Sequence, residues 1–221
     1  MSVQIDRKEV YRYLGFRGVV PSRDIADKVE VYIRKLEEVS APRSFCRYFP
    51  LLPAEDAQEE GGFVRFADLE IRSRNLAGNL RGCTQVCMLA VTIGIGADRL
   101  VSRAQLTDVA GAAICQAAGA AMAEAWCDEI NSGIISEAAR QSLYCRPRFS
   151  PGYGDFSLEH QKDFSRLLDM PRTCGIRLTD SLLMVPTKSI TALIGLSPEK
   201  SPCVMSGCES CSHSDTCSYK R

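Results

Sequence analysis

The segment 83–93 (CTQVCMLAVTI) limits the fold more than any other part of the chain, because it is apolar almost without interruption. A strand with one face in water alternates apolar and polar residues, whereas a strand buried on both faces carries apolar residues at successive positions. Gly94 and Gly96 break the run directly afterwards. The sequence therefore predicts a strand in the middle of a sheet.

Helical patterns occur on both sides of this strand. After the candidate N-cap Ser22, apolar residues recur at helical spacing until Pro42 ends the pattern, so one face of this helix is predicted to be core. Four more helices are predicted: a short one capped by Ser73, a brief one between Gly96 and Thr107, a long one from Thr107 to about Asn131 or beyond, and one over 157–168.

The remaining patterns favour strands in antiparallel arrangement. Segment 63–71 has the pattern of a hairpin arm, and 176–178, 182–185 and 190–196 are separated by turns, which predicts an antiparallel meander. Helices and strands come in separate blocks, so the fold class is α+β: an antiparallel or mixed sheet with flanking helices. We expect one such domain over 1–200 and a cysteine-rich tail over 201–221.

Composition argues against several functional classes. Lys plus Arg and Asp plus Glu both total 27, so no global basic field would attract nucleic acid or an anionic membrane. The N-terminus MSVQIDRKEV lacks the apolar core of a signal peptide, and we expect a cytoplasmic protein. The alanine-rich segment 109–127 contains Gln116 and Glu124, which indicates a helix of a soluble protein.

The chain holds 11 cysteines, and in a chain without an export signal these are not expected to form a disulfide framework. The four in the tail have the spacing Cys-x4-Cys-x2-Cys-x5-Cys, in which the x2 pair is typical of a metal knuckle. Zinc or an iron–sulfur cluster would each suit four thiolates, and a tail of reduced, unliganded thiols is the alternative. The candidate metal ligands are Cys203, Cys208, Cys211 and Cys217.

No arrangement of nucleophile and base is recognisable. His160 and His213 are the only histidines, and neither a Gly-x-Ser-x-Gly motif nor a phosphate-binding loop is present. Nothing in the sequence therefore indicates a hydrolase.

Three groups of residues, in consistent order, carry a resemblance to a known family. They are AEAW at 123–126, RFSPGY at 148–153, and a third group made of LTDS at 178–181 followed by Met184, Pro186, Ser189 and Pro198. Over about 105–200 the chain resembles the activation domain of cobalamin-dependent methionine synthase, which has an Arg-x-x-Pro-Gly-Tyr loop. It departs from that family at Ser197, where the family has His, and at Cys203, where the family has Tyr.

The resemblance implies a site for S-adenosylmethionine. The planar guanidinium of Arg148 is suited to the ligand's carboxylate, since it donates two parallel charge-assisted hydrogen bonds. Pro151 fixes the loop, Gly152 lets the backbone approach a ligand, and Tyr153 offers an aromatic face or a hydroxyl. Glu124 lies among alanines and is expected to meet a cation of the ligand or of the protein.

The function that the resemblance implies is reactivation, by reductive methylation, of the cobalamin of a separate methionine synthase or corrinoid methyltransferase. The chain would then be an accessory part of a methyltransferase system in methionine biosynthesis, with a flavodoxin or a ferredoxin as the electron donor. Two alternatives remain open from the residues: an iron–sulfur electron-transfer protein for a corrinoid partner, and a non-catalytic structural subunit with a zinc-clipped tail.

Overall fold

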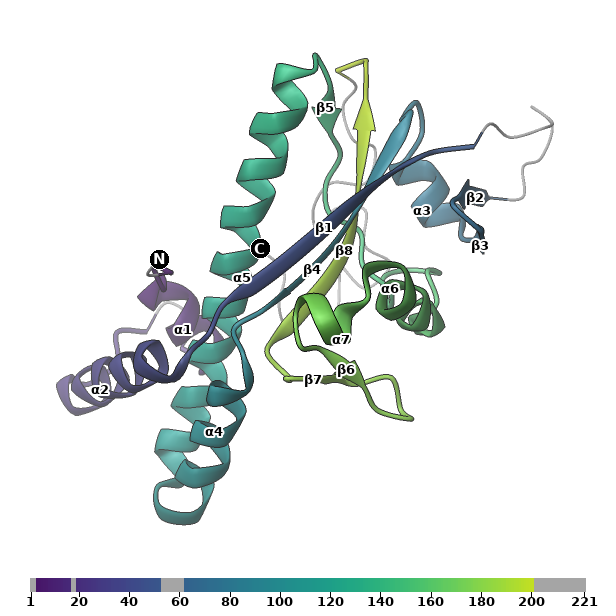
Figure 1. The fold of residues 1–221 in the computed structure, drawn as a ribbon. Coiled ribbons are helices and arrows are strands. Elements are labelled where there is room, and N and C mark those ends of the chain that lie inside the picture. The colour runs from purple at the N-terminus through teal and green to yellow at the C-terminus, as the bar shows by residue number, and fades with distance from the viewer. Residues whose placement is uncertain (1–2, 17–18, 53–61, 201–221) are drawn as a thin grey trace. The chain divides into compact units, whose positions relative to one another are not determined.

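The structure is a computed structural model that describes residues 3–16, 19–52 and 62–200 (Figure 1). It confirms the α+β class, with a mainly antiparallel arrangement of strands and flanking helices. The helices are α1 (Arg7–Tyr13), α2 (Arg23–Val39), α3 (Arg74–Asn79), α4 (Ile95–Thr107), α5 (Val109–Arg140), the 3-10 helix η1 (Leu158–His160), α6 (Gln161–Leu168) and α7 (Met170–Thr173). The strands are β1 (Arg43–Pro50), β2 (Phe63–Phe66), β3 (Leu69–Arg72), β4 (Gln85–Thr92), β5 (Tyr144–Cys145), β6 (Arg177–Leu178), β7 (Met184–Val185) and β8 (Ser189–Ser197).

The main sheet has four strands in the order β1-β4-β8-β5. Strand β4 lies between two neighbours, and every residue in it after Gln85 is buried. This confirms the interior strand that the apolar run predicted. Strand β5 pairs with β8 in antiparallel register, with Tyr144 opposite Ser197.

The chain divides into two compact units, each made from three stretches of sequence. The first unit contains Met1–Phe45, Ala90–Asn131 and Asp169–Ile190; the second contains Cys46–Leu89, Ser132–Leu168 and the chain from Thr191 onward. In the part of the chain that the structure describes, no helix is both long enough and apolar enough to cross a membrane.

In the first unit, α2 buries one face as its apolar spacing predicted: Val29, Ile33 and Leu36 are fully buried. The prediction that Thr107 caps the following long helix is wrong. Thr107 is the last residue of α4, and the Asp108 carboxylate accepts a hydrogen bond of 2.9 Å from the Gly111 amide at the start of α5. Asp108 is the better cap because a carboxylate also compensates the positive end of the helix dipole.

Two contacts from α2 hold Asp108 in that position. Lys28 Nζ donates to Asp108 Oδ1 at 2.7 Å, and the Tyr32 hydroxyl donates to Oδ2 at 2.8 Å. The hydrogen bond from Lys28, with those from Gly111 and Tyr32, lowers the pKa of Asp108 to about 2. Gly111 is required here, because a Cβ at that position would lie 2.1 Å from the Tyr32 hydroxyl oxygen.

In the second unit, segment 63–71, predicted as a single hairpin arm, instead contains both arms of a hairpin: β2 and β3 pair antiparallel, with Val64 opposite Ile71. Ser73 caps α3 as predicted, because its side chain accepts a hydrogen bond of 3.0 Å from the Leu76 amide. Helix α3 contacts β2, so hairpin and helix form one packed element.

The predicted meander is wrong in its last strand. Strands β6 and β7 pair only with each other, as a separate two-stranded sheet, whereas β8 joins the main sheet. Residues 191–197 of β8 are all buried, so both faces of this strand are covered. Such burial is typical of a strand inside a sheet, and β8 lies between β4 and β5.

Candidate functional site

The RFSPGY segment forms a loop that is fixed to β8 and folded on itself. The backbone of Phe149 exchanges two hydrogen bonds with that of Leu193, at 2.9 and 2.8 Å. Beyond this bridge, the Tyr153 amide donates to Ser150 O at 3.0 Å and the Gly152 amide donates to Phe156 O at 2.7 Å. The loop therefore has a defined backbone conformation.

Aromatic rings fill the inner side of the loop. Phe149 and Phe156 are buried, and their ring centroids lie 6.2 Å apart in a stacked arrangement. His160 stacks on Phe156 at 5.2 Å, and Tyr153 meets Phe149 edge to face at 6.1 Å. Such contacts add to the area that the rings bury, so the loop rests on a rigid apolar base.

The predicted ligand residues of the loop differ in their exposure. Arg148 is half-buried and Pro151 is buried. Gly152 is exposed and has φ +96°, a conformation that favours glycine. Tyr153 is 57% exposed although its ring edge contacts Phe149. The structure thus brings four of the predicted residues together: a cation, an open stretch of backbone and an aromatic ring.

Sequence reasoning missed the residues that attach this loop to α3. The Asp155 carboxylate accepts hydrogen bonds from the Ser73 hydroxyl at 2.5 Å, the Arg74 amide at 2.8 Å and the Asn75 amide at 3.1 Å. Desolvation raises the pKa of Asp155, but these hydrogen bonds outweigh it and leave the pKa below its ordinary value. No local pattern signals a partner about 80 residues away in the chain.

Glu124, the fifth predicted residue, lies on α5 within the first unit and is half-buried. The neighbouring Trp126 is buried and its indole N–H donates to Arg43 O at 3.0 Å, which fixes the helix against the start of β1. The loop belongs to the second unit.

The third matching segment, 184–189, has a different character. Ser189 is buried, and its hydroxyl lies 2.7 Å from Pro186 O and 2.9 Å from the Thr92 hydroxyl. Thr92 also accepts from the Gly94 amide at 3.1 Å and donates to Lys188 O at 3.3 Å. These hydroxyls satisfy one another and the backbone, so their part is structural.

Lys188 continues this network. Its ammonium donates to Gln116 Oε1 at 2.6 Å, and burial lowers its pKa, against the attraction of Asp98. The Asp98 carboxylate in turn accepts from the Thr187 amide at 2.8 Å. The segment is therefore held to α4 and α5 by side chains of both helices.

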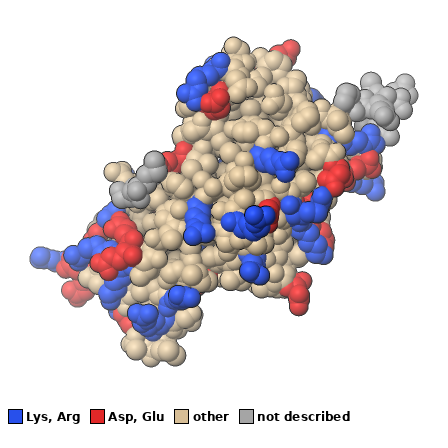
Figure 2. Space-filling model, viewed as in Figure 1, with Lys and Arg blue, Asp and Glu red and all other residues tan. Residues whose placement is uncertain are grey.

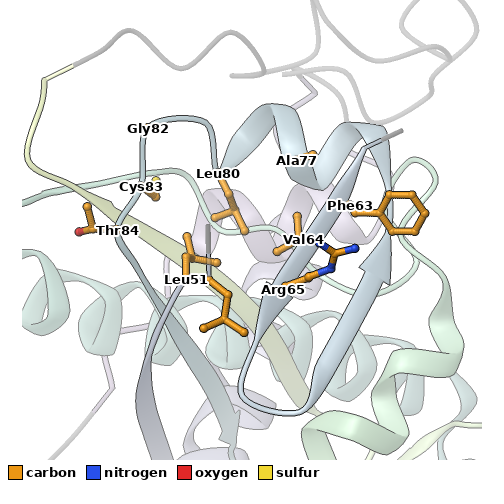
Figure 3. Close-up of a pocket in the computed structure, with 10 residues that line it drawn as sticks. Leu51, Phe63, Val64, Arg65, Ala77, Leu80, Gly82, Cys83 and Thr84 are labelled. Carbon is orange, nitrogen blue, oxygen red and sulfur yellow. The ribbon is translucent and has the colours of Figure 1, made fainter. Parts of the chain in front are cut away.

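A separate pocket of about 410 Å³ lies in the second unit (Figure 3). Its described lining is largely apolar and includes Leu51, Val64 and Leu80, with Cys83 and Thr84 at the start of β4. None of the five predicted ligand residues belongs to this lining. The pocket and the loop are therefore different features of the unit.

The cysteines divide into two groups. The four predicted metal ligands lie outside the described residues, and among the described residues no group of three or more His, Cys, Asp or Glu side chains is placed to hold a metal ion. Of the two cysteines in segment 83–93, Cys87 is buried and Cys83 is half-buried. A hydrogen bond with Cys87, together with one from Tyr48, lowers the pKa of Cys46 to about 7.

Charged side chains of both signs occur on the face of the molecule in Figure 2, several of them in adjacent groups. In the second unit, the side chains of Arg166 and Asp68 form an ion pair with two hydrogen bonds, of 2.7 and 3.0 Å. This distribution agrees with the balanced charge of the sequence.

Comparison with known proteins identifies the family. The family model for the vitamin B12 dependent methionine synthase activation domain matches residues 1–202, and so extends to the N-terminal part in which the sequence motifs found no counterpart. A search of the curated proteins finds no match. Among solved structures, the crystal structure of the MetH reactivation domain bound to AdoHcy matches with a TM-score of 0.67 and 16% identity. The match covers 90% of this chain and 75% of that one, and it shows that the fold is shared.

Proposed function

The chain belongs to the family of vitamin B12 dependent methionine synthase activation domains, and from this premise we propose that it binds S-adenosylmethionine at the loop 148–153. The observation that carries the proposal is the two-sided construction of the loop. Its inner side is a buried aromatic base, and its outer side presents the exposed backbone of Gly152 and a largely exposed Tyr153. Arg148, at the start of the loop, is half-buried, with Nη1 of its guanidinium buried.

These groups fit the chemistry of the ligand. S-adenosylmethionine has a carboxylate, an ammonium, a sulfonium, a ribose and an adenine. Arg148 would bind the carboxylate through its planar fork. Gly152 would let the ligand contact the backbone directly, and Tyr153 would offer its ring or its hydroxyl. The similar solved domain carries AdoHcy, the demethylated form of the same ligand, which supports the assignment.

Glu124 is proposed as the anionic part of the site. The segment 123–126, which contains Glu124, is one of the three groups of residues that carry the resemblance to the family, and this supports the role. The carboxylate would meet the ammonium or the sulfonium of the ligand. This role makes Glu124 a residue of ligand binding and leaves the chemistry to the cofactors.

The proposed activity is reactivation of a cobalamin that another protein holds. The cobalamin of a partner methionine synthase, or of another corrinoid protein, would supply the chemistry: in its cob(II)alamin form it would accept one electron and then the methyl group of S-adenosylmethionine, with release of S-adenosylhomocysteine. A flavodoxin or a ferredoxin is the proposed electron donor. The contribution of this chain is to bind the methyl donor and fix its orientation.

Titration calorimetry with S-adenosylmethionine tests the proposal. Arg148→Ala should weaken binding by about 2–3 kcal/mol, the scale for losing a charged hydrogen-bonding partner, and should leave the fold intact. Arg166→Ala is the matched control, because Arg166 is an exposed arginine of the same unit whose partner is Asp68. No binding by the parent protein, or equal binding by the parent and Arg148→Ala, would contradict the assignment.

Metal binding by the tail stays a prediction from spacing alone, and we propose zinc or an iron–sulfur cluster as the bound group. Replacing Cys208 and Cys211 together by Ser should abolish metal binding and spare the affinity for S-adenosylmethionine. Determination of iron, sulfide and zinc in anaerobically purified protein checks this. Substoichiometric metal in the parent protein would contradict it.

A further inference from the structure

Asp155 joins the end of the ligand loop to the start of α3. Its two carboxylate oxygens accept three hydrogen bonds, from the Ser73 hydroxyl and from the amides of Arg74 and Asn75. The two amides belong to the first turn of the helix, where N–H groups have no partner within the helix. The carboxylate therefore occupies a place where three donors converge.

The contact is reciprocal, because α3 also holds the backbone of the loop. Asn75 Oδ1 accepts a hydrogen bond of 3.2 Å from the Asp155 amide. Gly154 has φ +52°, and a Cβ added there would lie only 2.7 Å from Asn75 Oδ1. Loop and helix thus approach so closely that only glycine fits, with hydrogen bonds in both directions.

We propose that Asp155 is a positioning residue for the S-adenosylmethionine loop, an inference that rests on the proposed function. Two residues of the loop, Gly152 and Gly154, have positive φ. Glycine loses more conformational freedom on ordering than any other residue, so such a loop is costly to hold in one conformation. The contact with α3 holds the loop in one conformation in the ligand-free protein, so the entropy cost of ordering it is not subtracted from the binding free energy. Preorganisation of this kind raises affinity.

Capping of α3 alone would be a simpler role, but the helix already has a cap. Ser73 accepts from the Leu76 amide, as an N-cap residue does. The hydrogen bond from the Asp155 amide to Asn75 does nothing for the helix, whereas it fixes the loop. If Asp155 only caps α3, replacing it should leave the affinity for S-adenosylmethionine unchanged. If it positions the loop, replacing it should lower that affinity.

Calorimetry on Asp155 variants separates these roles. Asp155→Ala should weaken binding of S-adenosylmethionine about tenfold at a temperature where the variant is folded. Asp155→Asn keeps one acceptor oxygen and should lie between the parent and the Ala variant; it also replaces the Ala variant if that one fails to fold. Asp68→Ala, which removes an exposed carboxylate of the same unit, is the control and should bind within twofold of the parent.

A double-mutant cycle tests whether Asp155 acts through the loop. In a Tyr153→Ala background, Asp155→Ala should weaken binding at least threefold less than it does in the parent, because the ring that it positions is gone. An equal effect in both backgrounds would mean that Asp155 acts independently of Tyr153, and would overturn the proposal.

Hydrogen exchange of the ligand-free protein supplies a readout that does not depend on binding. Asp155→Ala should speed amide exchange at least tenfold at Tyr153 and Phe156, whose amides make hydrogen bonds within the loop, and leave exchange in β4 unchanged. Unchanged exchange at both amides would overturn the proposal. If the parent does not bind S-adenosylmethionine while this change is seen, the proposed function fails and Asp155 only orders the loop.

Discussion

The loop 148–153 and the turn 184–189 both match motifs of the same family, yet their polar and apolar side chains are arranged in opposite ways. In the loop, apolar rings lie inside and the polar Tyr153 is 57% exposed. In the turn, the hydroxyl of Ser189 points into the unit, where it meets Thr92, a residue that is 1% exposed.

The difference separates a surface that can bind a ligand from a scaffold. The buried polar groups of the turn form hydrogen bonds within the protein, so these groups are already engaged and are not exposed to a ligand. The loop is held by its rings and by α3, and it leaves Gly152 and Tyr153 exposed. A motif match therefore identifies the family, and the burial of its side chains indicates which motif segment can contact a ligand.

The inner side of the loop should be the most sensitive to change. Phe156→Ala removes a ring that is 1% exposed and stacks on Phe149 and His160, and should lower the free energy of unfolding by about 3–5 kcal/mol. Tyr153→Ala, in the same loop, should leave it within about 0.5 kcal/mol. Urea unfolding followed by circular dichroism compares them. A similar loss in the free energy of unfolding for both variants would contradict the distinction between a buried inner side and an exposed outer side of the loop.

The turn should respond in stability and not in binding. Thr92→Val keeps the shape of the side chain but removes the hydroxyl that the Gly94 amide and Ser189 use, so about 1–3 kcal/mol of stability should be lost. The affinity for S-adenosylmethionine should stay within twofold of the parent at a temperature where the variant is folded. A large loss of affinity would make the turn part of the site.

Glu124→Gln should weaken binding of S-adenosylmethionine by about 1 kcal/mol, less than Arg148→Ala does, because the amide keeps the shape of the carboxylate and loses only its charge. Calorimetry measures the change, with thermal unfolding as the control. If the variant unfolds instead, Glu124 belongs with the turn as a structural residue.

The smallest predicted effect is on how the free energy of unfolding depends on pH. Because the pKa of Asp155 is lower in the folded protein than its ordinary value, the carboxylate adds stability above the ordinary pKa and loses that contribution as pH falls through the folded value. Stability of the parent should therefore decrease below about pH 4, and Asp155→Asn should show a shallower decrease, whereas Thr92→Val should follow the parent. Urea titrations between pH 3 and 6 measure the slopes. Identical slopes in all three proteins would contradict the role of the hydrogen bonds to Asp155.

Local sequence signals predicted much of the fold. The apolar run predicted the interior strand β4, Ser73 predicted the cap of α3, and the RFSPGY motif predicted which residues would share one loop. Each of these signals lies within a few residues of the structure that it specifies, so spacing and residue type are enough to read it.

The predictions were wrong or incomplete at positions where the structure depends on contacts with residues far away in the sequence. Asp108 caps α5 because Lys28 and Tyr32 hold its carboxylate, and those residues lie about 80 positions earlier. Asp155 follows the motif directly but has its role only because α3 packs against it. Strand β8 left the predicted meander because its neighbours are β4 and β5. Pairings of this kind depend on the tertiary fold, which local periodicity does not encode.

The position of β4 between β1 and β8 has a consequence for the synthesis of the chain. When a ribosome has released β1 and β4, one edge of β4 still lacks its partner, and that partner is the last strand of the described fold. About a hundred residues must be synthesised after β4 before β8 leaves the ribosome. During that time one edge of β4, a strand that is apolar on both faces, has no hydrogen-bonding partner. Fragments that stop before residue 189 should therefore aggregate, and chaperone binding to nascent chains should concentrate on the interval between the two strands.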